Sequence, residues 1–164
     1  MRTLAIGLLG FLLAHGNAAA QTTQEQERIL RAFQQNVAEV AEQPYGFGVI
    51  PGAQTAPMPR IFTLPVATVV RQVITRALDE QVHATHMTGV GLELPLAHHP
   101  AVLEPFPATE LHEFPALLAR ALPPLPRRIE YRLIGNDLVL RDVDGDVIVA
   151  VLRDAVGRVA TARH

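Results

Sequence analysis

The most constraining feature of this sequence lies near its C-terminal end, where three runs of strand-forming residues alternate with two turn signals. The runs are Ile129 to Ile134, Asp137 to Arg141 and Asp146 to Leu152, and the turns are Gly135-Asn136 and Asp142 to Gly145. Turn residues between β-branched or aromatic runs are the strongest short-range signal for antiparallel hairpins. We therefore predict a three-stranded meander at the end of the domain.

The side-chain pattern of these runs predicts their burial. In the first run Tyr131 and Leu133 alternate with Glu130 and Arg132, so one face should point to the core and the other to solvent. The third run is apolar at every position from Val147 to Leu152. A run that is apolar on both faces is expected inside a sheet, with helices packed against one side.

Two amphipathic helices are predicted upstream. The first covers Thr23 to Gln43 and repeats apolar residues at three- and four-residue spacing. The second covers Val66 to Glu80 and starts at Pro65, which suits a first-turn position because its missing N–H is not needed there. The apolar stripe of the first helix consists of Ile29, Leu30, Phe33, Val37 and Val40.

Shorter elements complete the prediction. Extended pieces are expected at Met87 to Leu94 and at Pro100 to Pro107, and a short helix at Glu110 to Leu122 that restarts at Pro115. The fold class is then α+β: a small antiparallel sheet that ends in the meander, packed with two or three helices. The expected divisions are an N-terminal helix at 21–43, a Pro/Gly linker at 44–63, the α+β domain at 64–154 and a flexible tail at 155–164.

The first twenty residues have the pattern of a secretory signal peptide. Arg2 is followed by an apolar run from Leu4 to Ala14, and Ala18 and Ala20 provide the small-residue cleavage pattern. We predict cleavage after Ala20 and export to the periplasm. The apolar run is shorter than the roughly 20 residues that a membrane-spanning helix needs, so no stable membrane insertion is expected after cleavage.

Composition excludes several classes of protein. The chain has no cysteine, so no disulfide can stabilise it in an oxidising compartment. Its 14 basic residues, all arginine, stand against 16 acidic ones, and a weakly acidic chain without a basic stripe is not expected to bind nucleic acid.

The C-terminal region also resembles known families. The segments that carry the resemblance are Leu122 to Pro126, Glu130 to Leu140 and Val147 to Leu152, with Val90 to Pro95 and Leu103 to Pro107 upstream. They resemble the C-terminal meander of small proteobacterial exported proteins, among them the periplasmic nickel/cobalt-homeostasis family and a family of uncharacterised exported proteins. The resemblance covers roughly residues 71 to 152 and implies a fold and a periplasmic location rather than an activity. It transfers no metal ligand.

Histidines supply the candidate metal ligands, which are His83, His86, His98, His99 and His112. Neutral imidazole binds nickel, cobalt, copper and zinc, and two histidines three residues apart on a helix share one face. The alternative is that these are solvent-facing loop residues, because prolines interrupt the segment. An acidic pattern resembles the start of a calcium loop, with aspartates alternating at Asp142, Asp144 and Asp146. The Gly and the Glu that such a loop requires at later positions are missing. A hairpin turn is therefore expected here instead.

Catalysis has no recognisable motif here. The chain lacks cysteine and serine, and nothing in the sequence orients Thr85 or Thr109 as a nucleophile. We therefore expect a non-enzymatic periplasmic binding protein whose partner is an envelope protein or a second copy of the chain. The alternatives are an accessory protein of transition-metal homeostasis and a small enzyme without a known motif. A partner role predicts an exposed apolar patch or an open sheet edge.

Overall fold

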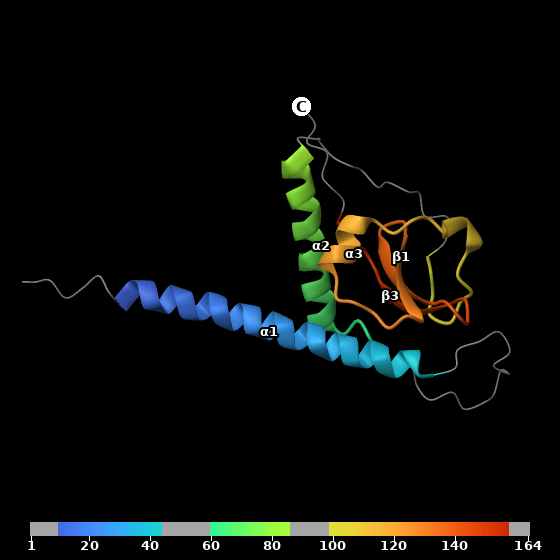
Figure 1. Ribbon diagram of the computed structural model, residues 1–164, viewed down its shortest axis with the longest axis horizontal. Helices are drawn as coiled ribbons and strands as arrows, with labels where there is room; N and C mark the ends of the chain where they lie inside the picture. The colour runs from blue at the N-terminus through green and yellow to red at the C-terminus, as the bar shows by residue number, and fades with distance from the viewer. Residues whose placement is uncertain (1–9, 44–59, 86–98, 158–164) are drawn as a thin grey trace, which may run out of the picture.

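A computed structural model describes residues 10–43, 60–85 and 99–157 of the chain. The helices are α1 (Gly10–Ala41), α2 (Leu64–Thr85) and α3 (Ala116–Ala121), with a 3-10 turn η1 at Ala108–Glu110. The strands are β1 (Ile129–Ile134), β2 (Asp137–Asp142) and β3 (Val147–Leu152). The predicted α+β fold with a C-terminal meander is confirmed, and α3 lies beside α2 (Figure 1).

The sheet is antiparallel in the order β1-β2-β3, so β2 is the central strand. The turn between β1 and β2 contains two residues, and Gly135 has φ 56°, a conformation that glycine adopts without steric cost. The expectation that the third strand lies inside the sheet is wrong, because β3 is at its edge. β3 is apolar throughout because both of its faces are covered.

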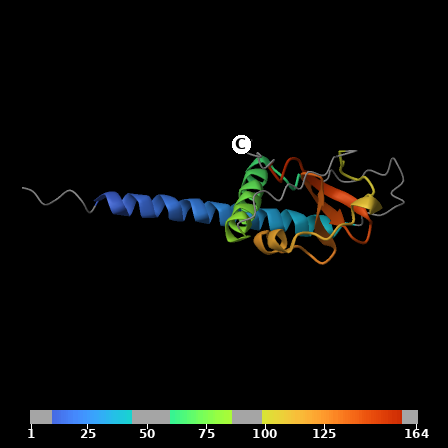
Figure 2. The same ribbon diagram turned by 90° about the horizontal axis from the view of Figure 1, so that it is seen from above.

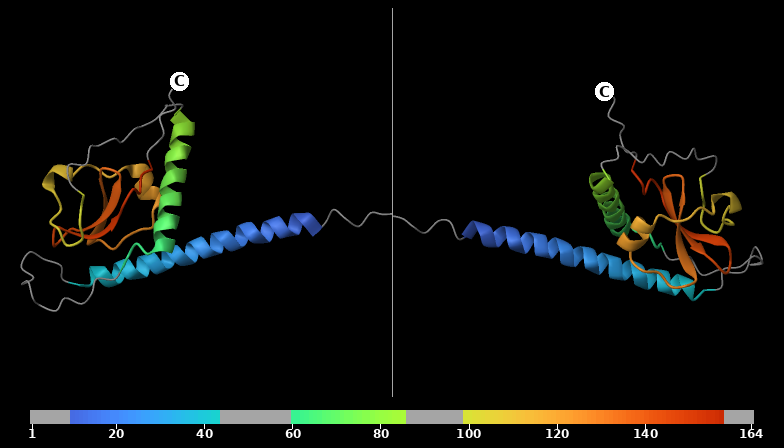
Figure 3. Two further views of the ribbon diagram at one scale, coloured as in Figure 1. Left: turned by 180° about the vertical axis from the view of Figure 1, so that it is seen from behind. Right: turned by 45° about the horizontal axis from the view of Figure 1, so that its top comes forward.

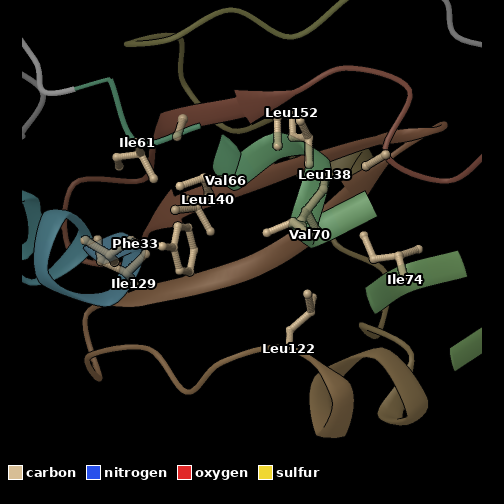
Figure 4. Packing of buried hydrophobic residues seen from close by; sticks show 14 of the residues in the cluster. Phe33, Ile61, Val66, Val70, Ile74, Leu122, Ile129, Leu138, Leu140 and Leu152 are labelled. Atoms are coloured by element: carbon tan, nitrogen blue, oxygen red, sulfur yellow. The ribbon is translucent and has the colours of Figure 1, made fainter. Parts of the chain in front are cut away.

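Two hydrophobic clusters lie on the two faces of the sheet. On the core face, Leu138, Leu140 and Leu152 pack against Val66 and Val70 of α2 (Figure 4). The second cluster, on the opposite face, consists of Phe106, Ile134, Val139 and Ile148, with Val151 packed against it. A bulge interrupts the β2–β3 register between Leu140 and Arg141, which allows both Val149 and Ala150 to join the core cluster.

The C-terminal half of α1 belongs to this core. Phe33, Val37 and Val40 are fully buried in the same cluster as the strands. The helix begins at Gly10 and not at the expected Thr23, because the Leu- and Ala-rich residues that precede Thr23 favour helix and allow it to continue. As a result the N-terminal part of α1 projects beyond the rest of the molecule, and α2 crosses α1 near its middle (Figures 1 and 2).

A strap formed by residues 101–107 covers the outer edge of β3 (Figure 3). The N–H groups of Leu103 and Phe106 donate to the carbonyls of Ile148 and Asp146 at 2.7 and 2.9 Å. In return the N–H of Ile148 donates to the carbonyl of Glu104 at 2.9 Å. The extended piece predicted here therefore exists in part, as an antiparallel bridge between Pro105 and Val147.

Further boundaries differ from the predictions. α2 covers Leu64–Thr85, beyond the predicted Val66 to Glu80 at both ends. The third helix starts only at Ala116, because Pro115 lacks an N–H and disfavours a helical conformation for the residue before it. The flexible tail is predicted from residue 155, but Ala155 and Val156 are 1% and 6% exposed and lie in the core cluster. The strand predicted at Met87 to Leu94 lies outside the described residues, as do residues 44–59 of the linker predicted at 44–63. Within residues 60–63 of that linker, Ile61 is 2% exposed and belongs to the core cluster. Over the described residues, no helix is both long and apolar enough to cross a membrane.

Candidate functional site

The structure describes the side chains of two of the five candidate metal ligands. His99 and His112 are both exposed, and His99 Nδ1 lies 3.9 Å from Asp137 Oδ2. His83 lies in the last turns of α2, with its backbone alone described, and His86 and His98 fall outside the described residues. Within the described part of the chain no group of three or more metal-binding side chains is assembled. The histidine site stays a prediction that depends on the other three residues.

Two carboxylates are buried at the two ends of β2, and an arginine holds each. Asp142 is 0% exposed and accepts hydrogen bonds from Arg128 Nε and Nη2 at 2.8 and 2.6 Å. Asp137 is 2% exposed and accepts from Arg153 Nη1 and from the backbone N–H of Asp154, at 2.7 and 2.8 Å. Because a buried charge is tolerated only when it is paired and hydrogen-bonded, both carboxylates have a structural role.

The acidic turn after β2 is organised by its own backbone. Asp142 Oδ1 accepts the N–H groups of Asp144 and Gly145 at 3.0 and 3.2 Å. The carboxylates of the other two aspartates in this turn pair with arginines. Asp144 Oδ2 lies 3.5 Å from Arg128 Nε, and Asp146 Oδ1 lies 2.6 Å from Arg141 Nη2. The expected hairpin turn between β2 and β3 is confirmed.

A network of charged residues crosses the strands on the second face of the sheet. Glu130 accepts from Arg132 and from Arg141, each at 2.7 Å, and Arg141 also pairs with Asp146. Burial alone would raise the pKa of Glu130, but the hydrogen bonds from Arg132 and Arg141 outweigh it and hold this pKa below its ordinary value of 4.5. The network keeps Glu130 ionised at neutral pH.

A wide groove lies between α1 and α2 and has a volume of about 1170 Å³. Its lining is polar: Gln26, Thr68, Arg71, Gln72, Thr75, Arg76, Asp79 and Glu80. Gln26 bonds to Gln72, and Arg71 is held by the carbonyl of Arg153. Among the described residues that line this groove there is no histidine and no buried carboxylate.

A smaller groove, here called the β1 groove, runs along the outer edge of β1 and has a volume of about 280 Å³. One wall is formed by α3 and the proline-rich connector, through Phe114, Ala119 and residues 123–125. The edge of β1, from Ile129 to Arg132, forms the other side. Phe114 stacks on Tyr131 with ring centroids 5.8 Å apart, and the Tyr131 hydroxyl donates to the carbonyl of Pro123 at 2.9 Å. Burial raises the pKa of Tyr131. These contacts fix the connector to β1.

The backbone of β1 leaves hydrogen-bonding groups free along its outer edge. In a hairpin with a two-residue turn, the closing pair Ile134–Asp137 exchanges hydrogen bonds, so Arg132 and Glu130 also direct their N–H and C=O groups at β2. Tyr131 and Leu133 then direct theirs outward. Within the described part of the chain these outward groups have no hydrogen-bond partner. The β1 groove therefore presents an open sheet edge.

Sequence reasoning did not locate this edge. The signal was present, because the length of the Gly135-Asn136 turn fixes which strand residues point outward. What the sequence did not show was which of the two outer strands the chain itself would cover.

Comparisons of the chain with protein-family models, with curated proteins and with solved structures give no match. The resemblance to periplasmic exported proteins therefore remains an expectation from the sequence.

Proposed function

We propose that the protein is exported to the periplasm and acts there as a non-enzymatic binding protein of the cell envelope. The observation that carries this proposal is the open edge of β1 inside a groove with apolar walls. An unpaired strand edge binds an extended segment through main-chain hydrogen bonds, and the flanking side chains provide selectivity. The ligand of the groove is then a strand of a protein.

The walls of the groove suit such a ligand. Phe114, Pro123 and Leu125 offer apolar surface, and Glu130 and Arg132 place one charge of each sign beside the edge. Proline-rich walls are already rigid, so little conformational entropy is lost when a strand binds. This arrangement gives the binding proposal a defined surface and needs no catalytic group.

Photo-crosslinking in intact cells tests the proposed binding surface. Benzoylphenylalanine in place of Ala119, which is exposed and lines the groove, should produce a covalent protein adduct on irradiation. The matched control is the same substitution at Ala38, which is exposed on α1 away from the groove. The adduct should disappear when Leu133→Pro removes an outward N–H of β1. Irradiation that yields no adduct at Ala119 would contradict the proposal.

Export has its own test. Cleavage after Ala20 would fall inside α1 and leave a chain that starts at Gln21. Mass spectrometry of protein from the periplasmic fraction should find this N-terminus. Protein retained in the cytoplasm with residues 1–20 attached would overturn the proposed location.

A further inference from the structure

The outward groups of β1 can pair with an identical strand. Tyr131 and Leu133 each present an N–H and a C=O, and Ile129 presents its C=O while its N–H donates to the carbonyl of Pro126 at 2.9 Å. If a second β1 runs antiparallel with Tyr131 opposite its own copy, the two tyrosines exchange a pair of hydrogen bonds. Each Leu133 N–H then faces the carbonyl of the partner's Ile129. Every free outward group then forms a hydrogen bond, except the C=O of Leu133. That carbonyl faces the N–H of the partner's Ile129, which already donates to Pro126.

The charges on β1 select this register over its neighbours. With Tyr131 at the centre, Glu130 lies opposite the partner's Arg132, and Arg132 lies opposite the partner's Glu130. Moving the centre by one residue in either direction places Glu130 opposite Glu130 or Arg132 opposite Arg132. Opposite charges in direct cross-strand pairs are favourable and like charges are unfavourable. The sequence Glu-Tyr-Arg is therefore complementary to itself in an antiparallel pair.

The existing charge network extends this complementarity across the sheet. Within one chain, Asp146 pairs with Arg141 at 2.6 Å and Arg141 pairs with Glu130 at 2.7 Å. Glu130 and Arg141 are direct cross-strand partners in the β1–β2 register. Asp146, Arg141 and Glu130 thus form a row of alternating charges across one chain. In the joined sheet the partner's Arg132 comes next to Glu130, so the alternation continues across the junction.

We infer that the occupant of the β1 groove is a second copy of this chain, paired β1 to β1 about a two-fold axis at Tyr131. The inference rests on the proposed function, because it names the partner that the open edge binds. Two three-stranded sheets would then form one continuous six-stranded antiparallel sheet. A two-fold pair of this kind closes on itself and leaves no further β1 edge to propagate an aggregate.

The absence of native cysteine makes the register directly testable. Residues 130 and 132 would form a non-hydrogen-bonded pair across the junction, with Cα atoms about 4.5 Å apart, which is within the range that a disulfide spans. The full-length gene is expressed with Glu130→Cys or with Arg132→Cys, and the two purified proteins are oxidised separately and as a mixture. We expect covalent dimer in the mixture and only traces of it in either protein alone.

The other outcomes each overturn the inference. Efficient cross-linking of Glu130→Cys alone, or of Arg132→Cys alone, would place a like pair at the junction and exclude the register. Absence of covalent dimer in all three samples would exclude the second copy as occupant. Thermal melts of both variants check that each remains folded.

Sedimentation of the unmodified protein provides a second test that does not depend on the cysteine variants. The weight-average mass should rise toward twice that of the chain with increasing concentration, and Leu133→Pro should stay monomeric while Leu133→Ala still dimerises. A monomer at every concentration would contradict the inference. If the Ala119 photo-adduct then has a mass other than twice that of the chain, the proposed binding function stands with a different partner. If no adduct forms at all, both proposals fail.

Discussion

The chain covers one edge of its small sheet and leaves the other edge open over the described residues. The outer edge of β3 is covered by the strap, with hydrogen bonds from Leu103 and Phe106 and one returned by Ile148. The outer edge of β1 has a groove beside it from Ile129 to Arg132, and Tyr131 and Leu133 direct unpaired backbone groups outward from this edge. Exposed edges favour uncontrolled pairing, and proteins usually cover them. The contrast between the covered and the open edge supports the proposal that the edge of β1 is a binding surface.

The difference also shows how each edge is stabilised. The strap covers β3 through side chains as well as backbone, because Phe106 is 4% exposed and joins Ile134, Val139 and Ile148 in the second cluster. Arg141 lies over the Phe106 ring, 5.2 Å from its centroid. The segments on either side of α3 make no ladder with β1. Phe114 stacks on Tyr131, and Arg132 Nη1 donates to the carbonyl of His112 at 2.9 Å. From the connector, the carbonyl of Pro123 accepts from the Tyr131 hydroxyl and that of Pro126 from the N–H of Ile129. The connector reaches β1 and leaves the edge available.

The largest predicted effect comes from uncovering the closed edge. Phe106→Ala removes the central side chain of the second cluster and should lower the free energy of unfolding by about 3–5 kcal/mol. Urea denaturation followed by circular dichroism measures this change. The control is Leu111→Ala, at a residue that is 49% exposed just beyond the strap, where the change should stay within about 0.5 kcal/mol. Equal effects at the two positions would mean that the strap does not cover β3.

Proline substitutions compare the two edges directly. The N–H of Ile148 donates to the strap, whereas that of Leu133 has no acceptor within the described part of the chain. Relative to alanine at the same site, proline at 148 should cost about 1–3 kcal/mol more, because the Glu104 carbonyl loses its partner. At 133 the difference between proline and alanine should be below about 1 kcal/mol under dilute, monomeric conditions. A large proline penalty at 133 in the monomer would show that this edge is already paired within the chain.

Acid should weaken the network beside the open edge. The pKa of Glu130 in the folded protein lies below 4.5, so its ion pairs contribute stability above that pH and lose it as the pH falls through the lowered value. Glu130→Gln should remove this part of the acid destabilisation, which we expect to be about 1 kcal/mol because the side chain is partly exposed. Urea denaturation from neutral pH down to about pH 3 measures it, with Glu113→Gln as a control at an exposed site. Parallel pH profiles for Glu130→Gln and the unmodified protein would contradict the assignment.

The smallest expected effect concerns metals. His99 and His112, the two candidate ligands with described side chains, are not part of a metal-binding cluster within the described residues. We expect nickel, cobalt, copper and zinc to leave the melting temperature of the chelator-treated protein unchanged. A ligand at a hundredfold excess over its Kd would add about 2.7 kcal/mol of stability, so binding would be evident. A rise in melting temperature that is lost with His83→Gln or His86→Gln would instead support the metal-homeostasis alternative.

Local patterns predicted the meander well and its surroundings less well. The three predicted strands match the observed ones to within one residue at each end, because short turns and β-branched runs specify hairpins locally. The partners of Asp137 and Asp142 were not predicted, since Arg153 and Arg128 reach them only after the chain folds back. The same limit applies to the edges. The pattern of β3 indicated burial on both faces, but a distant strap and not a flanking strand provides its cover.

The measurement that tests the central claim most directly is amide hydrogen exchange in β1 at two protein concentrations. The amides of Arg132 and Ile134 face β2 and should be protected at both. Those of Tyr131 and Leu133 should exchange fast in dilute protein and become protected in concentrated protein, because a second β1 then supplies their acceptors. Fast exchange of Tyr131 and Leu133 at both concentrations would contradict pairing of β1 with a second copy.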